Sequence, residues 1–125
     1  MSAVVDSSVL IDIIRGHAGA REALHAARAR SPLHGSEITR LEILMGMRPG
    51  EEDVTRRLIT GLRWHPVDES VAEAAGELGR TWLPSHNGID SADLAIAATV
   101  VLLDATLLTK NVKHFPMFDG LVPPY

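Results

Sequence analysis

The sequence predicts an α/β domain with a mostly parallel sheet. Short apolar segments alternate with longer segments whose apolar residues recur every three or four positions, which is typical of strands alternating with helices. The chain has 125 residues and no internal repeat or linker, so we expect a single domain over residues 1–125. Because crossovers between parallel strands are right-handed, helices should cover both faces of the sheet.

The N-terminal half begins with a buried strand. Ala3-Val4-Val5 is a short apolar run that ends at Asp6. Ser7 and Ser8 are able to cap the following helix, and Gly16 closes it. The next expected elements are a helix over 20–30, a strand over 33–35, a helix over 36–47 stopped by Pro49-Gly50, and a helix over 51–62.

The C-terminal half continues the alternation. Asp68 and Asp90 each precede a segment with helical periodicity and predict helix N-caps. The expected elements are a strand over 64–67, helices over 69–83 and 91–103, a strand over 105–108, a turn or short helix over 111–115, and an edge strand at 121–122.

The composition excludes several classes of protein. Cysteine is absent, which excludes disulfide scaffolds, thiolate nucleophiles and Cys-ligated zinc sites. The longest apolar stretch, Leu94 to Leu103, is about half the ~20 residues that span a bilayer, and Asp6 lies where a signal peptide would be apolar. We therefore expect a cytoplasmic protein without a membrane partner. The net charge of −4 differs from the positive charge of most nucleic-acid binders. If some carboxylates bind a cation, however, the rest of the surface is nearly neutral, so the net charge alone does not exclude a nucleic-acid partner.

Asp6 is the first candidate site residue. It follows the first strand, and the carboxyl ends of parallel strands are where such sheets place their sites. The alternative is that Asp6 only caps the next helix.

Glu42 lies on the apolar stripe of its predicted helix, together with Ile38, Leu41 and Met45. Burying a glutamate there is costly unless it is paired or binds a metal. An internal salt bridge to an arginine is the alternative.

Asp93 falls in the first turn of the helix over 91–103 and shares its apolar face. That face would hold Ile96, Ala97, Val100 and Val101. Asp90-Ser91-Ala92-Asp93 also has the outline of a capping box, which alone would explain both aspartates. We expect Asp90 to cap the helix and Asp93 to point inward.

Three inward carboxylates require a counter-charge or protonation, because like charges raise each other's pKa. Oxygen ligands select a hard cation such as Mg²⁺ or Mn²⁺. Such an ion activates water and stabilises a leaving oxygen, so the predicted chemistry is metal-dependent phosphodiester hydrolysis.

Four segments carry a family resemblance over essentially the whole chain: 5–11, 39–46, 90–99 and 108–115. In this order and at these separations they resemble the PIN-domain family, and within it the VapC-type toxins of bacterial type II toxin–antitoxin pairs. The resemblance implies a three-layer α/β/α fold with a central, mostly parallel sheet. It also implies that Asp6, Glu42 and Asp93 are the catalytic acids and the ligands of Mg²⁺ or Mn²⁺.

The resemblance further implies that Ser8 and Thr109 orient the carboxylates and bound water. Asn111 occupies a position that is acidic in many family members; it can supply an oxygen but no charge, so we expect one firmly bound ion. Lys110 and Lys113 flank Asn111 and are candidate contacts for substrate phosphates.

Other polar residues have ordinary interpretations. The six histidines show no pair at metal-ligand spacing, and we expect His114 to have a packing or surface role. Arg21, Arg28 and Arg30 would form one basic helical edge.

The function implied by the resemblance is that of a metal-dependent endoribonuclease toxin that cleaves structured RNA such as tRNA. Its implied partners are a cognate antitoxin and a second copy of the chain in a homodimer. The alternative is a weakly active or inactive binding module on the same fold, which acts with an antitoxin in DNA-binding autoregulation.

Overall fold

The computed structural model describes residues 2–125, which form an α/β domain as the sequence predicts. In chain order the elements are β1 (Ala3–Val5), α1 (Ser7–Ile14), α2 (Ala18–Arg30), β2 (Leu33–Ser36), α3 (Glu37–Met45), α4 (Glu52–Thr60), β3 (Arg63–His65), α5 (Glu69–Trp82), α6 (Ser91–Leu103), β4 (Thr106–Leu108) and a 3₁₀ turn (Val112–His114).

The strands form a parallel sheet in the order β3-β2-β1-β4. Val5 pairs with Leu108, so the carboxyl ends of β1 and β4 lie side by side. Asp6 and Thr109 are therefore neighbours at one edge of the sheet, where the predicted site belongs.

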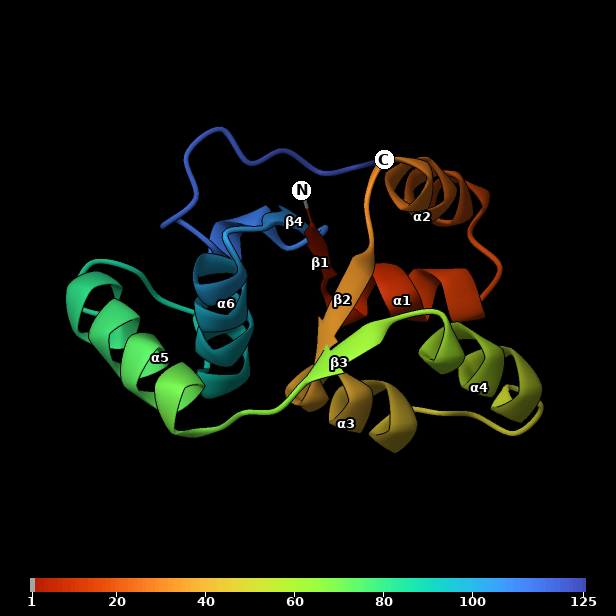
Figure 1. Ribbon diagram of the computed structural model, residues 1–125, viewed down its shortest axis with the longest axis horizontal. Coiled ribbons are helices and arrows are strands. Elements are labelled where there is room, and N and C mark those ends of the chain that lie inside the picture. Colours follow the sequence, from red (N-terminus) through yellow and green to blue (C-terminus); the bar gives the residue numbers. More distant parts are fainter. Residues whose placement is uncertain (1) are drawn as a thin grey trace.

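Helices cover both faces of the sheet, which confirms the three-layer arrangement. Figure 1 shows α1, α2 and α4 on one side of the strands and α5 and α6 on the other. Successive strand residues point to opposite faces: Ala3 and Val5 pack in the core under α1 and α2, whereas Val4 packs with residues of α6.

The predicted face of α3 is wrong. Leu41 and Met45, expected on the buried stripe, are 55% and 77% exposed. The buried residues of α3 are Thr39 and Ile43. This nine-residue helix packs against α1 on one side and α6 on the other. The stripe that faces the core is therefore narrower than the sequence pattern indicated.

The buried face of α6 also differs from the prediction at one position. Val101 is 51% exposed, because α6 is apolar all round and its periodicity does not define a single face. Even so, neither α6 nor any other helix within residues 2–125 has the length and hydropathy needed to cross a membrane.

The edge strand predicted at 121–122 does not form, and the chain there is irregular. Val122 is 70% exposed, and Pro123 and Pro124 directly follow it without backbone N–H groups to donate to a sheet. The third strand lies at Arg63–His65, one residue earlier than expected at its start and two at its end.

Candidate functional site

Asp6 is a buried carboxylate held by two hydroxyl groups. It is 3% exposed, and its Oδ2 accepts hydrogen bonds from Ser8 Oγ at 2.7 Å and from Thr109 Oγ1 at 2.8 Å. Asp6 occupies the N-cap position of α1, but its side chain makes no capping hydrogen bond. The interpretation of Asp6 as only a helix cap is therefore wrong, as is that of Ser8 as a cap.

The backbone after β4 fixes these hydroxyl groups in turn. The Lys110 N–H donates to Ser8 Oγ at 3.1 Å, and the Asn111 N–H donates to Thr109 Oγ1 at 3.0 Å. Asn111 thus helps to position Thr109 through its main-chain N–H. Within residues 2–125 its exposed side-chain amide makes no hydrogen bond. Both hydroxyl protons remain available to Asp6.

Glu42 extends from α3 toward the start of α1. Ser7 Oγ donates to Glu42 Oε1 at 3.1 Å, so Ser7 is not a helix cap either. Burial raises the pKa of Glu42; the Ser7 hydrogen bond opposes this, while the charges of Asp6 and Asp90 raise the pKa further. The glutamate therefore lies in the electrostatic field of the other acids.

The alternative of a salt bridge for Glu42 has no support in the structure. Within residues 2–125 no arginine lies within 4 Å of its carboxylate. The nearest candidate in sequence, Arg40, instead pairs with Glu37 at 2.6 Å.

Asp93 combines both roles proposed for it. Asp90 and Asp93 form a reciprocal capping box at the start of α6, in which the Asp90 N–H donates to Asp93 Oδ2 at 3.1 Å and the Asp93 N–H donates to Asp90 Oδ1 at 2.8 Å. Asp93 is also buried, at 9% exposure, whereas Asp90 is exposed. Burial raises the pKa of Asp93 to about 6, with the Asp90 N–H and His114 opposing and the Asp90 carboxylate adding to the effect.

His114 is a site residue that the sequence analysis missed. Its Nδ1 lies 3.2 Å from Asp93 Oδ2, because the 3₁₀ turn carries it to the beginning of α6. The only sequence signal was its place in the segment that follows the β4 strand end.

The two lysines predicted to contact substrate lie in different environments. Lys110 Nζ is 3.1 Å from Asp12 Oδ2 and lies over the ring of Tyr125, whose hydroxyl donates to the same Asp12 oxygen at 2.8 Å. Lys113 is exposed and makes no ion pair within residues 2–125. The charge of Lys110 is thus largely balanced, and that of Lys113 is free.

The three carboxylates share a pattern of hydrogen bonding. In each, one oxygen is held by the protein, while the other accepts no hydrogen bond from residues 2–125: Asp6 Oδ1, Glu42 Oε2 and Asp93 Oδ1. Free carboxylate oxygens suit a hard divalent cation, and Mg²⁺ often takes one or two carboxylates and keeps its waters. Over the same part of the chain, no three acidic or histidine side chains form a ready-made metal cage. The oxygen donors therefore fit Mg²⁺ or Mn²⁺ in kind. The described part of the chain brings Asp6 close enough to Glu42 to act on its pKa but shows no closed set of three ligands.

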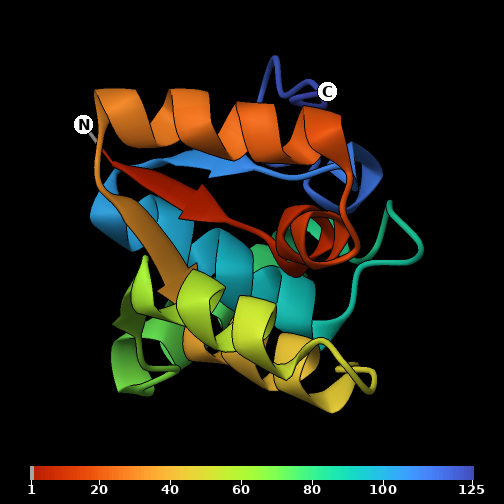
Figure 2. The same ribbon diagram turned by 90° about the vertical axis from the view of Figure 1, so that its right-hand side faces the viewer.

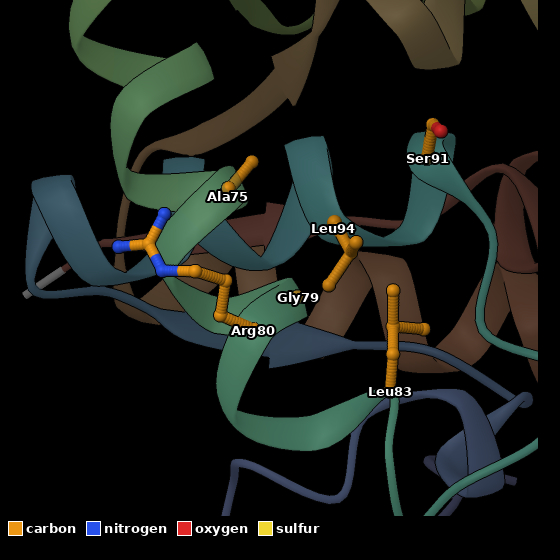
Figure 3. Close-up of a pocket in the computed structure, with 7 residues that line it drawn as sticks. Ala75, Gly79, Arg80, Leu83, Ser91 and Leu94 are labelled. Carbon is orange, nitrogen blue, oxygen red and sulfur yellow. The ribbon is translucent and has the colours of Figure 1, made fainter.

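One concave surface of the molecule is lined by none of the three acids. An open groove of about 390 Å³ runs between α5 and α6, with Ala75, Gly79, Leu83 and Leu94 along it and Arg80 and Ser91 at its border (Figure 3). None of the predicted site residues lines it. Its apolar walls lack the groups that hydrolytic chemistry requires.

Comparisons with known proteins agree with the resemblance predicted from the sequence. The PIN domain model matches residues 3–119. The chain is 38% identical over 123 residues to "Ribonuclease VapC19" and 43% identical over 122 residues to "Ribonuclease VapC10", both of Mycobacterium tuberculosis (strain ATCC 25618 / H37Rv). These alignments cover 98% of this chain, and 98% and 92% of the respective relatives.

Solved structures give the same assignment. A toxin–antitoxin complex from Klebsiella pneumoniae contains a chain that aligns with a TM-score of 0.82 and 29% identity over 98% of both chains. VapBC2 from Rickettsia felis, bound to a DNA fragment from its promoter, aligns with a TM-score of 0.79 over 98% of this chain and 97% of that one; at 21% identity it shows the fold alone. Because the PIN domain model matches nearly the whole chain and the relatives align over 98% of it, this chain belongs to the PIN-domain family.

Proposed function

We propose that the protein is a metal-dependent endoribonuclease and the toxin of a type II toxin–antitoxin pair. Its similarity to two ribonucleases over nearly the full length supports the activity class. The observation that carries the proposal is the arrangement at Asp6: two hydroxyls hold Oδ2 and leave Oδ1 free. Beside it lies Glu42, whose pKa is raised by burial first and by the charge of Asp6 in addition.

In this proposal Asp6 and Asp93 hold Mg²⁺ or Mn²⁺ through their free oxygens. A bound ion of this kind supplies an activated water and stabilises the leaving oxygen of a phosphodiester. Glu42 would contact such an ion directly or through a water. Its free Oε2 would orient the attacking water, while Ser7 fixes Oε1.

The supporting groups have separate roles. Ser8 and Thr109 keep Asp6 oriented by donating to one oxygen only. His114 Nδ1 lies beside Oδ2 of Asp93, the oxygen that already accepts a hydrogen bond from the Asp90 N–H, and it leaves Oδ1 open. Lys113 is the better placed of the two lysines to meet a substrate phosphate, because Asp12 already neutralises Lys110.

The proposed partners are an RNA substrate such as tRNA, a cognate antitoxin and a second copy of the chain. The antitoxin is supported by structural relatives solved as toxin–antitoxin complexes. Leu41 and Met45 on α3 expose apolar surface beside Glu42, which a protein partner would remove from water. Light scattering on the purified chain tests the homodimer directly.

Glu42→Gln tests the activity. The substitution keeps the shape and the Ser7 hydrogen bond but removes the charge, so we expect RNA cleavage to fall at least ~100-fold and growth arrest on expression to disappear. Glu37→Gln is the matched control, because Glu37 lies on the same helix and pairs only with Arg40; it should retain activity. Undiminished cleavage of a tRNA pool by Glu42→Gln would remove Glu42 from the mechanism.

An inactive binding module is the second candidate function. It is favoured by the uncharged Asn111 and by the absence of a three-residue metal cage within residues 2–125. This function predicts no cleavage of any RNA with Mg²⁺ or Mn²⁺, together with promoter-DNA binding that requires the antitoxin. A cleavage assay and a gel-shift assay on the same preparation separate the two functions.

A further inference from the structure

A groove rimmed by positive side chains lies between α2 and α4, away from the acids. It has a volume of about 260 Å³. Arg21, His25 and Arg28 line it from α2, and Arg57 lines it from α4. In Figure 2, α2 runs above α4, and α1 is seen end-on between them. These three helices supply the residues that line the groove.

The three arginines are uncompensated charges. Within residues 2–125, no carboxylate lies within 4 Å of the guanidinium of Arg21, Arg28 or Arg57. By contrast, Arg15 and Arg40 are paired with Glu51 and Glu37. Eight of the ten arginines make no ion pair within residues 2–125, and three of these eight line this one groove. Their charges attract anions to it.

The arginines are arranged along a line rather than around a point. Arg21, His25 and Arg28 are spaced four and three residues apart, so they share one stripe of α2 that is about 10 Å long. This is the length of roughly three stacked nucleotides. Arg57 stands on the opposite wall. The groove can therefore follow a linear polyanion.

Arg28 reaches from α2 across to α4. Its guanidinium lies so close to Gly61, at the end of α4, that a Cβ there would be 2.9 Å from Nη2. This places a planar fork that matches a phosphate between the two walls of the groove.

The floor of the groove offers little to an apolar ligand. Ile13, Leu24 and Leu58 form it, and they are only 7%, 5% and 9% exposed. An amphipathic helix needs an apolar surface to cover. The lining side chains that are exposed to solvent are Arg21, His25, Arg28 and Arg57. A phosphate backbone running along the rim meets these cations first, which favours it over a segment that must fill the apolar floor.

The groove is one short helix away from the acids. The α1 helix carries Ser7, which donates to Glu42, and six residues later Ile13, which lies in the groove floor; at 1.5 Å per residue this is about 9 Å. RNA at the acids meets like charge, and Lys110 is neutralised by Asp12. Besides a bound ion and Lys113, cations farther along the strand would therefore add binding energy.

We propose that Arg21, Arg28 and Arg57 bind backbone phosphates of the RNA beside the segment that enters the acidic site. The inference rests on the proposed function, because that function makes RNA the substrate. It assigns the arginines to substrate positioning, not to the reaction itself.

The test is RNA binding by the Glu42→Gln protein in EDTA, measured with a fluorescent single-stranded RNA of about 20 nucleotides. Arg28→Gln with Arg57→Gln removes two groove charges. Arg56→Gln with Arg80→Gln is the control: it makes the same change in net charge at two exposed arginines that do not line the groove. Circular dichroism melting checks that both proteins are folded.

We expect the groove pair to weaken binding at least tenfold at about 100 mM salt and the control pair at most twofold. The slope of log Kd against log salt should fall by about 1.4 in the groove pair, at ~0.7 for each lost single-strand phosphate contact. Equal weakening by both pairs would overturn the inference, because only net charge would then matter. If the groove pair binds RNA normally but binds poly-L-glutamate more weakly, the inference is also overturned. The groove would then bind an acidic protein.

Cleavage is measured separately, on proteins with Glu42 intact. If the unmodified chain cleaves no RNA while the groove pair still loses RNA affinity selectively, the proposed activity fails and the phosphate-binding groove stands. If the chain cleaves RNA and the groove pair binds and cleaves like the control pair, the activity stands and the groove assignment fails.

Discussion

Thr109 Oγ1 donates a 2.8 Å hydrogen bond to Oδ2 of Asp6, across 103 positions of the chain. Both residues are buried, at 0% and 3% exposure, and they directly follow paired strands. A buried carboxylate is costly without donors, and hydrogen bonds to its charged form are among the stronger ones in proteins. The same hydrogen bond therefore stabilises this edge of the sheet and orients Asp6, the proposed metal ligand.

Thr109→Val should be both destabilising and harmful to activity. The substitution keeps the shape but removes a donor to a buried carboxylate, which costs about 1.5–3 kcal/mol. Chemical denaturation measures the free energy of unfolding, and RNA cleavage is followed on the same protein. Retention of full stability and full cleavage would mean that Ser8 alone is sufficient to hold Asp6.

Thr55→Val should have the opposite effect on stability. Thr55 is fully buried on α4, and its Oγ1 finds no hydrogen-bond partner within residues 2–125. Replacing an unsatisfied hydroxyl with a methyl group should raise the free energy of unfolding by about 1 kcal/mol and leave cleavage unchanged. It is thus a control for Thr109→Val, and a loss of stability would show that the hydroxyl is satisfied in solution.

Divalent ions should stabilise the folded protein. Burial raises the pKa of Glu42, and repulsion from Asp6 and Asp90 adds to this effect. Mg²⁺ or Mn²⁺ at the acids would relieve that repulsion, and a ligand that binds only the folded state raises the melting temperature. At ~100 times the Kd the gain is about 2.7 kcal/mol. Thermal melts with and without EDTA check this, and Asp6→Asn should reduce the shift. If millimolar metal leaves the melting temperature of the unmodified chain unchanged, the binding-module function gains support.

His34 should make stability depend on pH. Its Nδ1 lies 2.7 Å from His65 Nε2, its Nε2 is buried without a partner within residues 2–125, and burial, followed by the charges of His65 and Arg63, lowers its pKa below 6.5. The unfolded chain therefore binds a proton more readily than the folded one. Stability is fully present above about pH 6.5 and declines as the pH falls from there toward the lowered pKa of the folded state.

Denaturation at a series of pH values measures this effect. His34→Gln should flatten the decline below pH 6.5, while His25→Gln, at an exposed histidine, should leave it unchanged. If the free energy of unfolding of His34→Gln declines equally steeply below pH 6.5, then titratable groups other than His34 cause the decline.

Local chemistry made several features of the fold predictable. Asp68 and Asp90 were expected to cap helices, and each accepts a hydrogen bond from the N–H three residues later. The alternation of strands and helices predicted the parallel sheet and its two covered faces. Glu42 was selected because it was placed on an apolar stripe, and that stripe was wrong, since Leu41 and Met45 are exposed. Glu42 nevertheless lies close enough to Asp6 for the charge of Asp6 to raise its pKa further.

Other features could not be read from neighbouring residues. His34 and His65 come together because β2 and β3 pair in parallel, and no spacing of histidines along the chain indicated this. The same holds for His114 against Asp93 and for Lys110 against Asp12. Each contact depends on where two distant backbone segments come to lie.

The sequence by itself determined the fold class, the helix caps at Asp68 and Asp90, and the placement of Asp6 at a strand end, since propensity, periodicity and capping act over a few residues. Only the tertiary structure decided which oxygen of each carboxylate is held, which face of α3 is exposed, and which arginines remain unpaired around the groove. Hydrogen bonds and ion pairs act over a few ångströms in space, and strand pairing and helix packing set those distances independently of separation along the chain.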